Sequence, residues 1–450
     1  MNFSEIKSII AARARELGIA EYEIYYMSSD DTTVETLNRE INGFSSGTRG
    51  GICLRVVASG KLGYAATELI EENEIAMLPE RAKDNAKYVE KPDTVGIFEG
   101  SASYEEQRVP EYNPMSAREL KEYAKLVADK LFSESDKVVN GTASRAVATG
   151  FEIRIANSHG LDLSTSCGIN AALAEAVVSV GDEMQSAYSI EELKRDNVEG
   201  SVDKMVSRTV KDALDKIGAN SVESGKYNVL FDGKQMRALL SVFSSAFSAR
   251  QVLDGMSMLK GKLGEAVASD VVTVTDDPQR EGLSIGTTFD AEGVATHRKA
   301  VIESGILKTY LHNRETALAM GTESTANASK GDYSSPVSIM PHSFCIEAGD
   351  KSFDELLALV GDGIYVTELQ GLHAGANPIT GDFSLQSAGF MIRGGKICEA
   401  VKSFTVAGNF FTLLKGIEAL SDKIELAVPT GFTGFGAPAA LVRDMSVSGK

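Results

Sequence analysis

The sequence has few of the side chains on which common catalytic and metal-binding motifs depend. It contains five histidines and four cysteines in 450 residues. The two closest histidines, His297 and His312, are 15 residues apart. No HExxH helix or similar pair of zinc ligands is therefore present. CxxC is absent as well. The wide spacing of the cysteines predicts reduced, buried thiols rather than disulfides; they are Cys53, Cys167, Cys345 and Cys398.

Long apolar runs and basic clusters are also missing. No segment approaches the roughly 20 apolar residues of a membrane span. The first 18 residues carry charges throughout, which predicts an amphipathic helix rather than a signal peptide. Asp and Glu number 63 against 45 Lys and Arg, a net charge of −18, whereas nucleic-acid binding needs a basic surface. We therefore expect a cytoplasmic protein that binds neither nucleic acid nor membrane.

The length and the pattern of apolar residues predict two domains of α+β class. A chain of 450 residues is too long for one hydrophobic core. The segment GANSVESG at 218–225 is the best linker, and it divides the chain into domains 1–222 and 223–450. The first should hold an antiparallel sheet with helices, and the second a strand-rich antiparallel barrel or sandwich, because glycines punctuate its strands regularly.

The elements expected in the first domain alternate between short strands and longer helices. The strands are expected at 22–27, 32–37, 51–58, 61–66, 152–156 and 171–180, and helices at the N-terminus and at 69–91, 116–132 and 201–217.

Three motifs resemble functional signatures, but their context argues against each. Residues 43–47 match G-x-S-x-G, yet a strand follows instead of a helix, so we predict a hairpin loop. Residues 434–439 match G-x-G-x-x-A, but they contain Pro438 and lead into a strand, so a dinucleotide site is rejected. His312 and Glu315 could share a helix face, and an ordinary solvated polar face is the simpler interpretation.

One polar, glycine-rich loop between two apolar strands is the candidate site. It is the stretch GLHAGANPITGDFS. Two interpretations stay open. Gly, Asn, Pro and Asp are turn residues, so the loop could be a long structural turn. Alternatively it lines a cleft that holds a substrate, because function tends to gather on such loops. The candidate cleft residues are His373, Asn377, Thr380, Gly381 and Asp382.

Short segments along almost the whole chain form a recognisable series. In the second half they are 289–294 (FDAEGV), 302–307 (IESGIL), 366–369 (VTEL), 371–373 (GLH), 380–384 (TGDFS), 388–390 (AGF) and 405–409 (TVAGN). In the first half they are 42–43 (NG), 49–52 (RGGI), 60–64 (GKLGY) and 181–186 (GDEMQS). In this order they resemble the TldD/PmbA family, which is known as a peptidase family and as "modulator of DNA gyrase" proteins.

The resemblance also implies a branch of the family. The TldD branch carries an H-E-x-x-x-H zinc helix after the first strand of the second domain, and a further cysteine ligand near the C-terminus. The matching helix is expected at 236–247 here. Ser241, Val242 and Ala246 stand where the first His, the Glu and the second His would be, and 430–441 contains no cysteine. The chain thus resembles the PmbA (TldE) branch, which lacks the motif and pairs with a TldD-type subunit.

The resemblance implies a non-catalytic subunit without a metal or cofactor of its own. Zinc would lie on a TldD-type zinc peptidase partner in a heterodimer, and this chain would complete a cleft for an extended, small, unfolded peptide. Two alternatives stay open. One is a stand-alone peptidase that uses unrecognised residues such as His373 and Asp382. The other is a non-enzymatic, homodimeric binding protein. A role at DNA gyrase gains little support from a net charge of −18.

Overall fold

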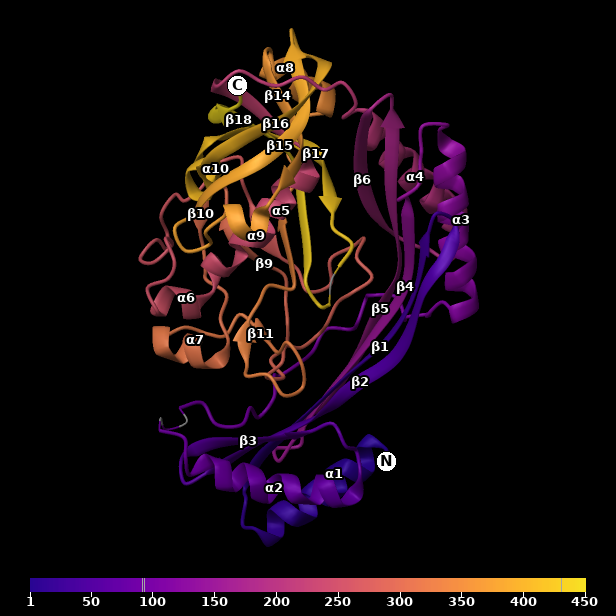
Figure 1. Ribbon diagram of the computed structural model, residues 1–450. Coiled ribbons are helices and arrows are strands. Elements are labelled where there is room, and N and C mark those ends of the chain that lie inside the picture. Colours follow the sequence, from indigo (N-terminus) through magenta and orange to yellow (C-terminus); the bar gives the residue numbers. More distant parts are fainter. Residues whose placement is uncertain (91, 93, 430) are drawn as a thin grey trace.

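The structure is a computed structural model, and it describes residues 1–90, 92, 94–429 and 431–450 (Figure 1). Lys91, the last residue of the predicted helix 69–91, lies outside the described residues, as does Thr430 in the cysteine-free segment. The described elements form two large sheets, with helices beside each, and the α+β prediction is confirmed. No helix in the described ranges combines the length and the apolar character that crossing a membrane requires.

The first sheet consists of six antiparallel strands in the order β3-β2-β1-β4-β5-β6. Its inner strands are unusually long and twist across the molecule from α1 and α2 to α3 and α4 (Figure 1). The strands are β1 (Glu21–Leu37), β2 (Glu40–Ala58), β3 (Lys61–Thr67), β4 (Ala143–Asn157), β5 (Asp162–Val180) and β6 (Glu183–Glu192).

Helices cover this sheet at its two ends and create two separate cores. Capping boxes at Asn2 with Glu5 and at Ser116 with Glu119 begin α1 and α3, which satisfies backbone donors at those helix starts. Ile6 and Ile10 of α1 pack in one core, while the apolar faces of α3 and α4 pack in the other. The four helices are α1 (Phe3–Glu16), α2 (Glu72–Ala86), α3 (Ala117–Glu134) and α4 (Val198–Leu214).

The hairpin loop predicted at residues 43–47 is wrong, because this segment lies inside β2. The turn occurs earlier, at Asn38 and Arg39, which have φ values of 50° and 70°. A two-residue turn with positive φ at both positions matches the twist of the adjoining strands, so β2 starts at once. The serine in the G-x-S-x-G match therefore lies on an exposed strand and not on a nucleophile elbow.

The second sheet has the barrel character that was predicted. Strands β18, β16, β15, β14 and β7 pair in a closed ring. The expectation of purely antiparallel pairing is wrong, because β14 with β7 and β13 with β18 are parallel. Long connections with helices join these pairs, so no hairpin forces them to be antiparallel.

The strands of the second sheet vary greatly in length. They are β7 (Gly225–Phe231), β8 (Val274–Asp276), β9 (Lys299–Glu303), β10 (Ile306–Leu307), β13 (Ser343–Ile346), β14 (Gly363–Gln370), β15 (Asp382–Arg393), β16 (Lys396–Asn409), β17 (Ile417–Leu426) and β18 (Gly434–Ser448). A separate two-stranded sheet consists of β11 (Ala328–Ser329) and β12 (Ser338–Ile339).

The helices of this half are short and pack on the second sheet and its loops. They are α5 (Gly233–Phe243), a 3-10 turn (Ser244–Phe247), α6 (Ala249–Leu253), α7 (Arg314–Met320), α8 (Phe353–Val360), α9 (Leu372–Gly375) and α10 (Phe410–Gly416). The helix expected at 236–247 therefore ends at Phe243, where the ring stacks on Phe410 with centroids 4.6 Å apart. The main core of this half is built around these aromatic rings.

The two halves of the chain touch through the loop that precedes α3 and through side chains of the first sheet. Tyr104 donates a hydrogen bond to the Gly293 carbonyl at 2.8 Å. The rings of Phe151 and Phe432 lie 5.0 Å apart. The Lys216 ammonium is 2.5 Å from Glu368. A boundary at 222/223 stays a prediction, which we keep because the first sheet ends before it and the second sheet begins after it.

The cysteines are free thiols, as expected, but one of them is not buried. Cys53, Cys167 and Cys345 lie in the interior, whereas Cys398 is exposed. Cys398 follows the Gly394–Gly395 turn on β16, where the side chains face solvent. The prediction of a buried thiol is therefore wrong at this position.

Candidate functional site

A cleft of about 520 Å³ lies between the two halves of the chain. Its walls come from elements that are far apart in sequence. They are residues of β5 and β6 (Glu175, Ser186, Ala187, Tyr188), the end of α4 and the residues after it (Asp212, Asp215, Lys216), α5 (Lys234, Gln235, Ala238), the end of β14 with α9 (367–373), β15 (388–390) and Val401. A cavity of this size accommodates several residues of an extended peptide.

Helix α5 holds one wall of the cleft in place. Its N-cap Asp232 accepts a hydrogen bond from the Lys234 backbone at 2.9 Å and one from the Tyr365 hydroxyl at 2.5 Å. Gln235 is buried and bridges to β14, because it donates to the Thr367 carbonyl at 2.6 Å and accepts from the Leu369 backbone at 3.0 Å. The end of β14 and the start of α5 are thereby fixed to each other.

Two charged groups that line the cleft have shifted pKa values. Burial lowers the pKa of Lys234, and the nearby Arg208 lowers it further. Burial raises the pKa of Asp212, which the charges of Arg208 and Lys234 oppose only in part. Perturbed carboxylates and amines in a cleft are a common mark of a binding site. Neither residue was predicted from the sequence, because no local motif contains them.

The predicted loop residues divide between two environments. His373, on α9, lines the cleft and is exposed. Asn377, Thr380, Gly381 and Asp382 are not among the described residues that line it.

These four residues form a hydrogen-bonded turn instead. The Asn377 side chain accepts from the Ile379 and Thr380 backbones at 3.0 and 3.3 Å. Asn409 donates to the Thr380 carbonyl at 2.8 Å and to Asp382 at 2.9 Å. The bond from Asn409 to Asp382 lowers the pKa of Asp382, and the Thr380 side chain lowers it further. Gly381 has φ of +83°, in the region that favours glycine. The four residues therefore form a structural turn, whereas a role of His373 in holding a substrate stays a prediction.

The positions that the resemblance assigns to zinc binding come next along the chain, after the residues of α5 that line the cleft. Ala238 lines the cleft, and Ser241 and Val242 lie about one helical turn later. Ser241 is half-buried, Val242 packs against the core and Ala246 is buried. A hydroxyl and two hydrocarbon side chains do not supply the nitrogen, thiolate and carboxylate ligands that zinc takes, so these residues do not fit the metal. Across the described ranges, no group of three or more His, Cys, Asp and Glu could hold a metal ion.

The interpretation of His312 and Glu315 as a solvated helix face is wrong for His312. His312 is buried and precedes the N-cap of α7, and its Nδ1 atom has no hydrogen-bond partner among the described residues. Glu315 lies on α7 and pairs with Arg250 at 2.8 Å. The two residues therefore do not share a helix face.

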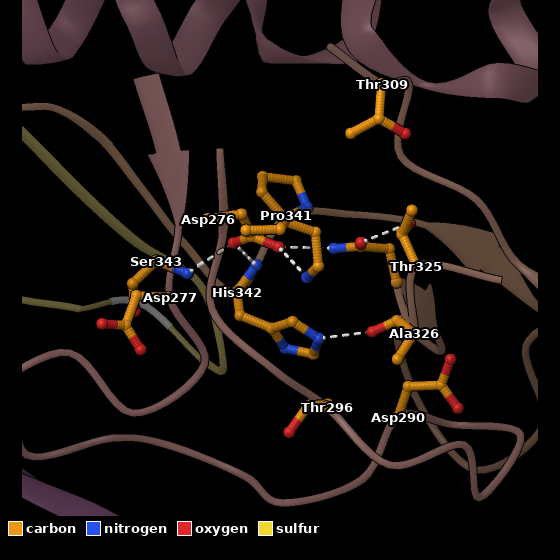
Figure 2. A network of polar contacts seen from close by, with 12 residues as sticks. Asp276, Asp277, Asp290, Thr296, Thr309, Thr325, Ala326, Pro341, His342 and Ser343 are labelled. Carbon is orange, nitrogen blue, oxygen red and sulfur yellow. Dashed lines mark hydrogen bonds and ion pairs between the residues drawn. The ribbon is translucent and has the colours of Figure 1, made fainter. Parts of the chain in front are cut away.

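A buried polar network occupies the C-terminal half (Figure 2). The Asp276 carboxylate accepts from the His342 and Ser343 backbones at 2.8 and 3.0 Å, from Asn327 at 2.7 Å and from Lys299 at 3.1 Å. Burial alone would raise the pKa of Asp276, but Lys299, His342 and Asn327 outweigh it and lower the pKa.

The histidine in this network has a fixed tautomer. Figure 2 shows the His342 ring directed at the Ala326 carbonyl, 2.7 Å from Nε2. A carbonyl only accepts, so Nε2 carries the proton. Burial lowers the pKa of His342 despite the neighbouring Asp276, with Lys299 and His297 acting in the same direction. The ring is therefore neutral at physiological pH, and the network does not adjoin the large cleft.

His342 makes a testable contribution to acid sensitivity. Its folded pKa lies below the unfolded value of about 6.5, so the unfolded chain binds more protons as the pH falls below that value. Stability should therefore fall as the pH is lowered from about 6.5 towards the folded pKa, by up to about 1.4 kcal/mol per pH unit for this residue. His342→Gln, which can keep the bond to Ala326, should reduce this slope in urea unfolding at several pH values. The dependence of unfolding free energy on pH should not vanish, because burial also lowers the pKa of His312. An unchanged dependence in His342→Gln would contradict the assignment of part of it to His342.

Comparisons with known proteins identify relatives over nearly the whole chain. Models of the PmbA/TldA metallopeptidase domain 1, central domain and C-terminal domain match residues 22–86, 110–217 and 224–449. A metalloprotease of Methanothermobacter thermautotrophicus is 29% identical over 90% of each chain. The metalloprotease PmbA of Escherichia coli O157:H7 is 25% identical, over 90% of this chain and 88% of the relative.

Solved structures agree with these relatives. The crystal structure of a putative modulator of a DNA gyrase from Thermotoga maritima superposes with a TM-score of 0.89 at 28% identity, over 99% of this chain and 100% of the other. TldE of Thermococcus kodakarensis shares the fold, with a TM-score of 0.87 at 24% identity, over 98% and 99% of the two chains.

Proposed function

This chain belongs to the PmbA/TldA metallopeptidase family, and on that premise we propose that it is a PmbA/TldE-type, non-catalytic subunit of a two-subunit metallopeptidase. Zinc and the chemistry of cleavage would reside on a TldD-type partner subunit. This chain would complete the cleft that holds a small, unfolded peptide, and it would need no metal or cofactor of its own. The cytoplasm is the expected compartment.

The observation that carries this proposal is a well-formed cleft whose adjoining metal positions hold unsuitable side chains. The cleft is about 520 Å³, and Gln235 and Asp232 fix its α5 wall by hydrogen bonds. Ser241 and Val242 stand next along that wall, where a catalytic relative would need His and Glu. A binding surface without its metal ligands suits a subunit that positions peptide for chemistry supplied elsewhere.

Strand β6 would hold an extended peptide by strand pairing. It is the last strand of the first sheet, so its outer edge has backbone groups that a peptide strand can pair with. The Ser186 carbonyl points to that edge, because it accepts from the Lys216 ammonium at 2.8 Å. Met184, Tyr188 and Ile190 are 57%, 57% and 45% exposed on one face of the strand, where they could contact apolar side chains of the peptide.

Reconstitution with a TldD-type subunit tests the proposal. Peptide cleavage should be at least about tenfold faster with this chain than without it, a difference of about 1.4 kcal/mol in barrier height. Ala238→Trp should fill the cleft, and it should lower cleavage while leaving the complex intact on gel filtration. Exposed Lys260→Met, remote from the cleft, is the control and should behave as the unmodified chain. Cleavage that is unchanged when this chain is omitted would refute the proposal.

The same preparation distinguishes the two alternatives. Peptidase activity of this chain alone that is lost in His373→Ala would indicate a stand-alone enzyme. A stable homodimer that never associates with a TldD-type subunit would indicate a self-assembled binding protein. Our proposal expects no cleavage by the purified chain alone and a heterodimer when both subunits are present.

A further inference from the structure

Lys234 has an unusual environment at the corner of the cleft. Within the described part of the chain, no carboxylate oxygen lies within 4.0 Å of its ammonium. Its partner is an aromatic face, because Nζ lies 5.3 Å from the centroid of the Tyr188 ring. The contact joins α5 in the C-terminal half to β6 in the N-terminal half. A cation–π contact at a partly exposed site is a weak attachment for an ammonium.

Two carboxylates flank this aromatic face. Glu175 on β5 is the direct cross-strand partner of Tyr188, so both side chains project from the same face of the sheet. Glu175 is exposed and makes no ion pair within the described ranges. Asp212 lines the same cleft, and its ion pair with Arg208 is long, at 3.9 Å. The cleft therefore holds one ring and two weakly compensated carboxylates, and the Lys234 ammonium lies against the ring.

A ring face with adjacent carboxylates is the kind of site that binds lysine and arginine side chains. Tyr188 is 57% exposed, so a side chain from a bound peptide can reach the ring from the cleft. The ammonium that now lies there belongs to the chain itself. Burial and Arg208 disfavour its charged form and lower its pKa, although Asp212 acts in the opposite direction.

We propose that Tyr188, Glu175 and Asp212 form a subsite for one Lys or Arg side chain of an extended peptide, and that Lys234 occupies this subsite when no peptide is bound. The proposal rests on the proposed function, since it concerns the same cleft. It adds a substrate class, namely peptides with a basic residue at one position. Entry of the basic side chain would displace the Lys234 ammonium towards solvent.

Binding of two matched peptides to the purified chain, alone and in complex with the TldD-type subunit, tests the subsite. One is a short unfolded peptide with a single central lysine, and the other has norleucine in its place. Tyr188→Leu should weaken binding of the lysine peptide about three- to tenfold and leave the norleucine peptide almost unchanged. Tyr188→Phe keeps the ring face and should preserve the preference. Lys234→Met should strengthen binding of the lysine peptide about threefold, because it vacates the subsite.

A charge-matched control separates the subsite from the general attraction of an acidic chain for cations. Lys204→Met on α4 removes the same charge outside the cleft lining, and it should leave the preference between the peptides unchanged. If Tyr188→Leu weakens both peptides equally, or if Lys234→Met does not strengthen the lysine peptide, the subsite is overturned while the proposed function stands. If neither peptide binds the chain or its complex, the proposed function fails together with the subsite.

Discussion

Asp276→Asn is expected to lower the free energy of unfolding by about 3–5 kcal/mol, because the substitution removes one member of a buried ion pair. Asp276 is fully buried, and the Lys299 side chain beside it is 7% exposed. The amide that replaces the carboxylate would direct hydrogens at Asn327 or Lys299, both of which are donors. The Lys299 ammonium would remain buried without an anion. Urea unfolding followed by circular dichroism measures the loss.

The double variant Asp276→Asn with Lys299→Met is the decisive control. It removes the stranded ammonium, so it should recover part of the stability lost in Asp276→Asn. The pH dependence gives a second check. Because the folded pKa of Asp276 is lowered, its stabilising contribution is present above the unfolded pKa of about 3.9 and is lost as the pH falls through the folded value. The two proteins should therefore converge in stability at strongly acidic pH. An equal deficit in the single and double variants would show that the ion pair is not the cause.

The C-terminal half has two regions with different roles. One is the buried network around Asp276, and the other is the wall of the cleft. The network joins β8, β9 and the segments before β11 and β13 by charge-assisted hydrogen bonds, which are among the stronger ones in proteins. The cleft is separate from this network and lies between the two halves of the chain, where Gln235 and Tyr365 brace α5. A rigid scaffold beneath an open, partly polar cleft suits a surface that receives a peptide.

Local patterns predicted the elements with a single clear apolar face. The N-terminal helix was expected from Ile6 and Ile10, which are buried in α1. Helices 116–132 and 201–217 correspond to α3 and α4 within about three residues, because capping residues and helical spacing act locally. Strand β6 was missed, since Met184, Tyr188 and Ile190 are exposed and give no signal of burial.

The cleft could be predicted only in small part, because long-range pairing builds it. His373 was a candidate and lines the cleft. Lys234 and Tyr188 meet although 46 residues separate their positions in the sequence. Gln235 reaches Thr367 across 132 residues. No periodicity encodes such contacts, because they join elements that only the folded chain brings together, namely α5 with β6 and α5 with β14.

A second buried ion pair should show strong non-additivity. Glu23 and Arg55 are cross-strand partners on β1 and β2, and the guanidinium lies 2.6 Å from the carboxylate. Their side chains are 1% and 5% exposed. Arg55→Met should cost about 3–5 kcal/mol of unfolding free energy, because it leaves the Glu23 carboxylate buried without its partner. By contrast, Lys87→Met breaks an exposed pair with Asp84 and should cost less than about 1 kcal/mol.

The double variant Glu23→Leu with Arg55→Met should be far more stable than the sum of the single losses predicts, because apolar residues of similar size often replace a buried ion pair without loss. The Glu23–Arg55 pair also lies where the two halves of the chain meet, so its removal affects a residue of the other half. Lys330 of the C-terminal half lies with its ammonium 4.7 Å from the centroid of the Tyr25 ring, next to this pair, and Glu23 helps to raise the pKa of Lys330 against its burial. Removing Glu23 also takes that compensation from Lys330, so full recovery would require Lys330→Met as well. A double-mutant cycle measures the coupling, and additive losses would show that Glu23 and Arg55 act independently.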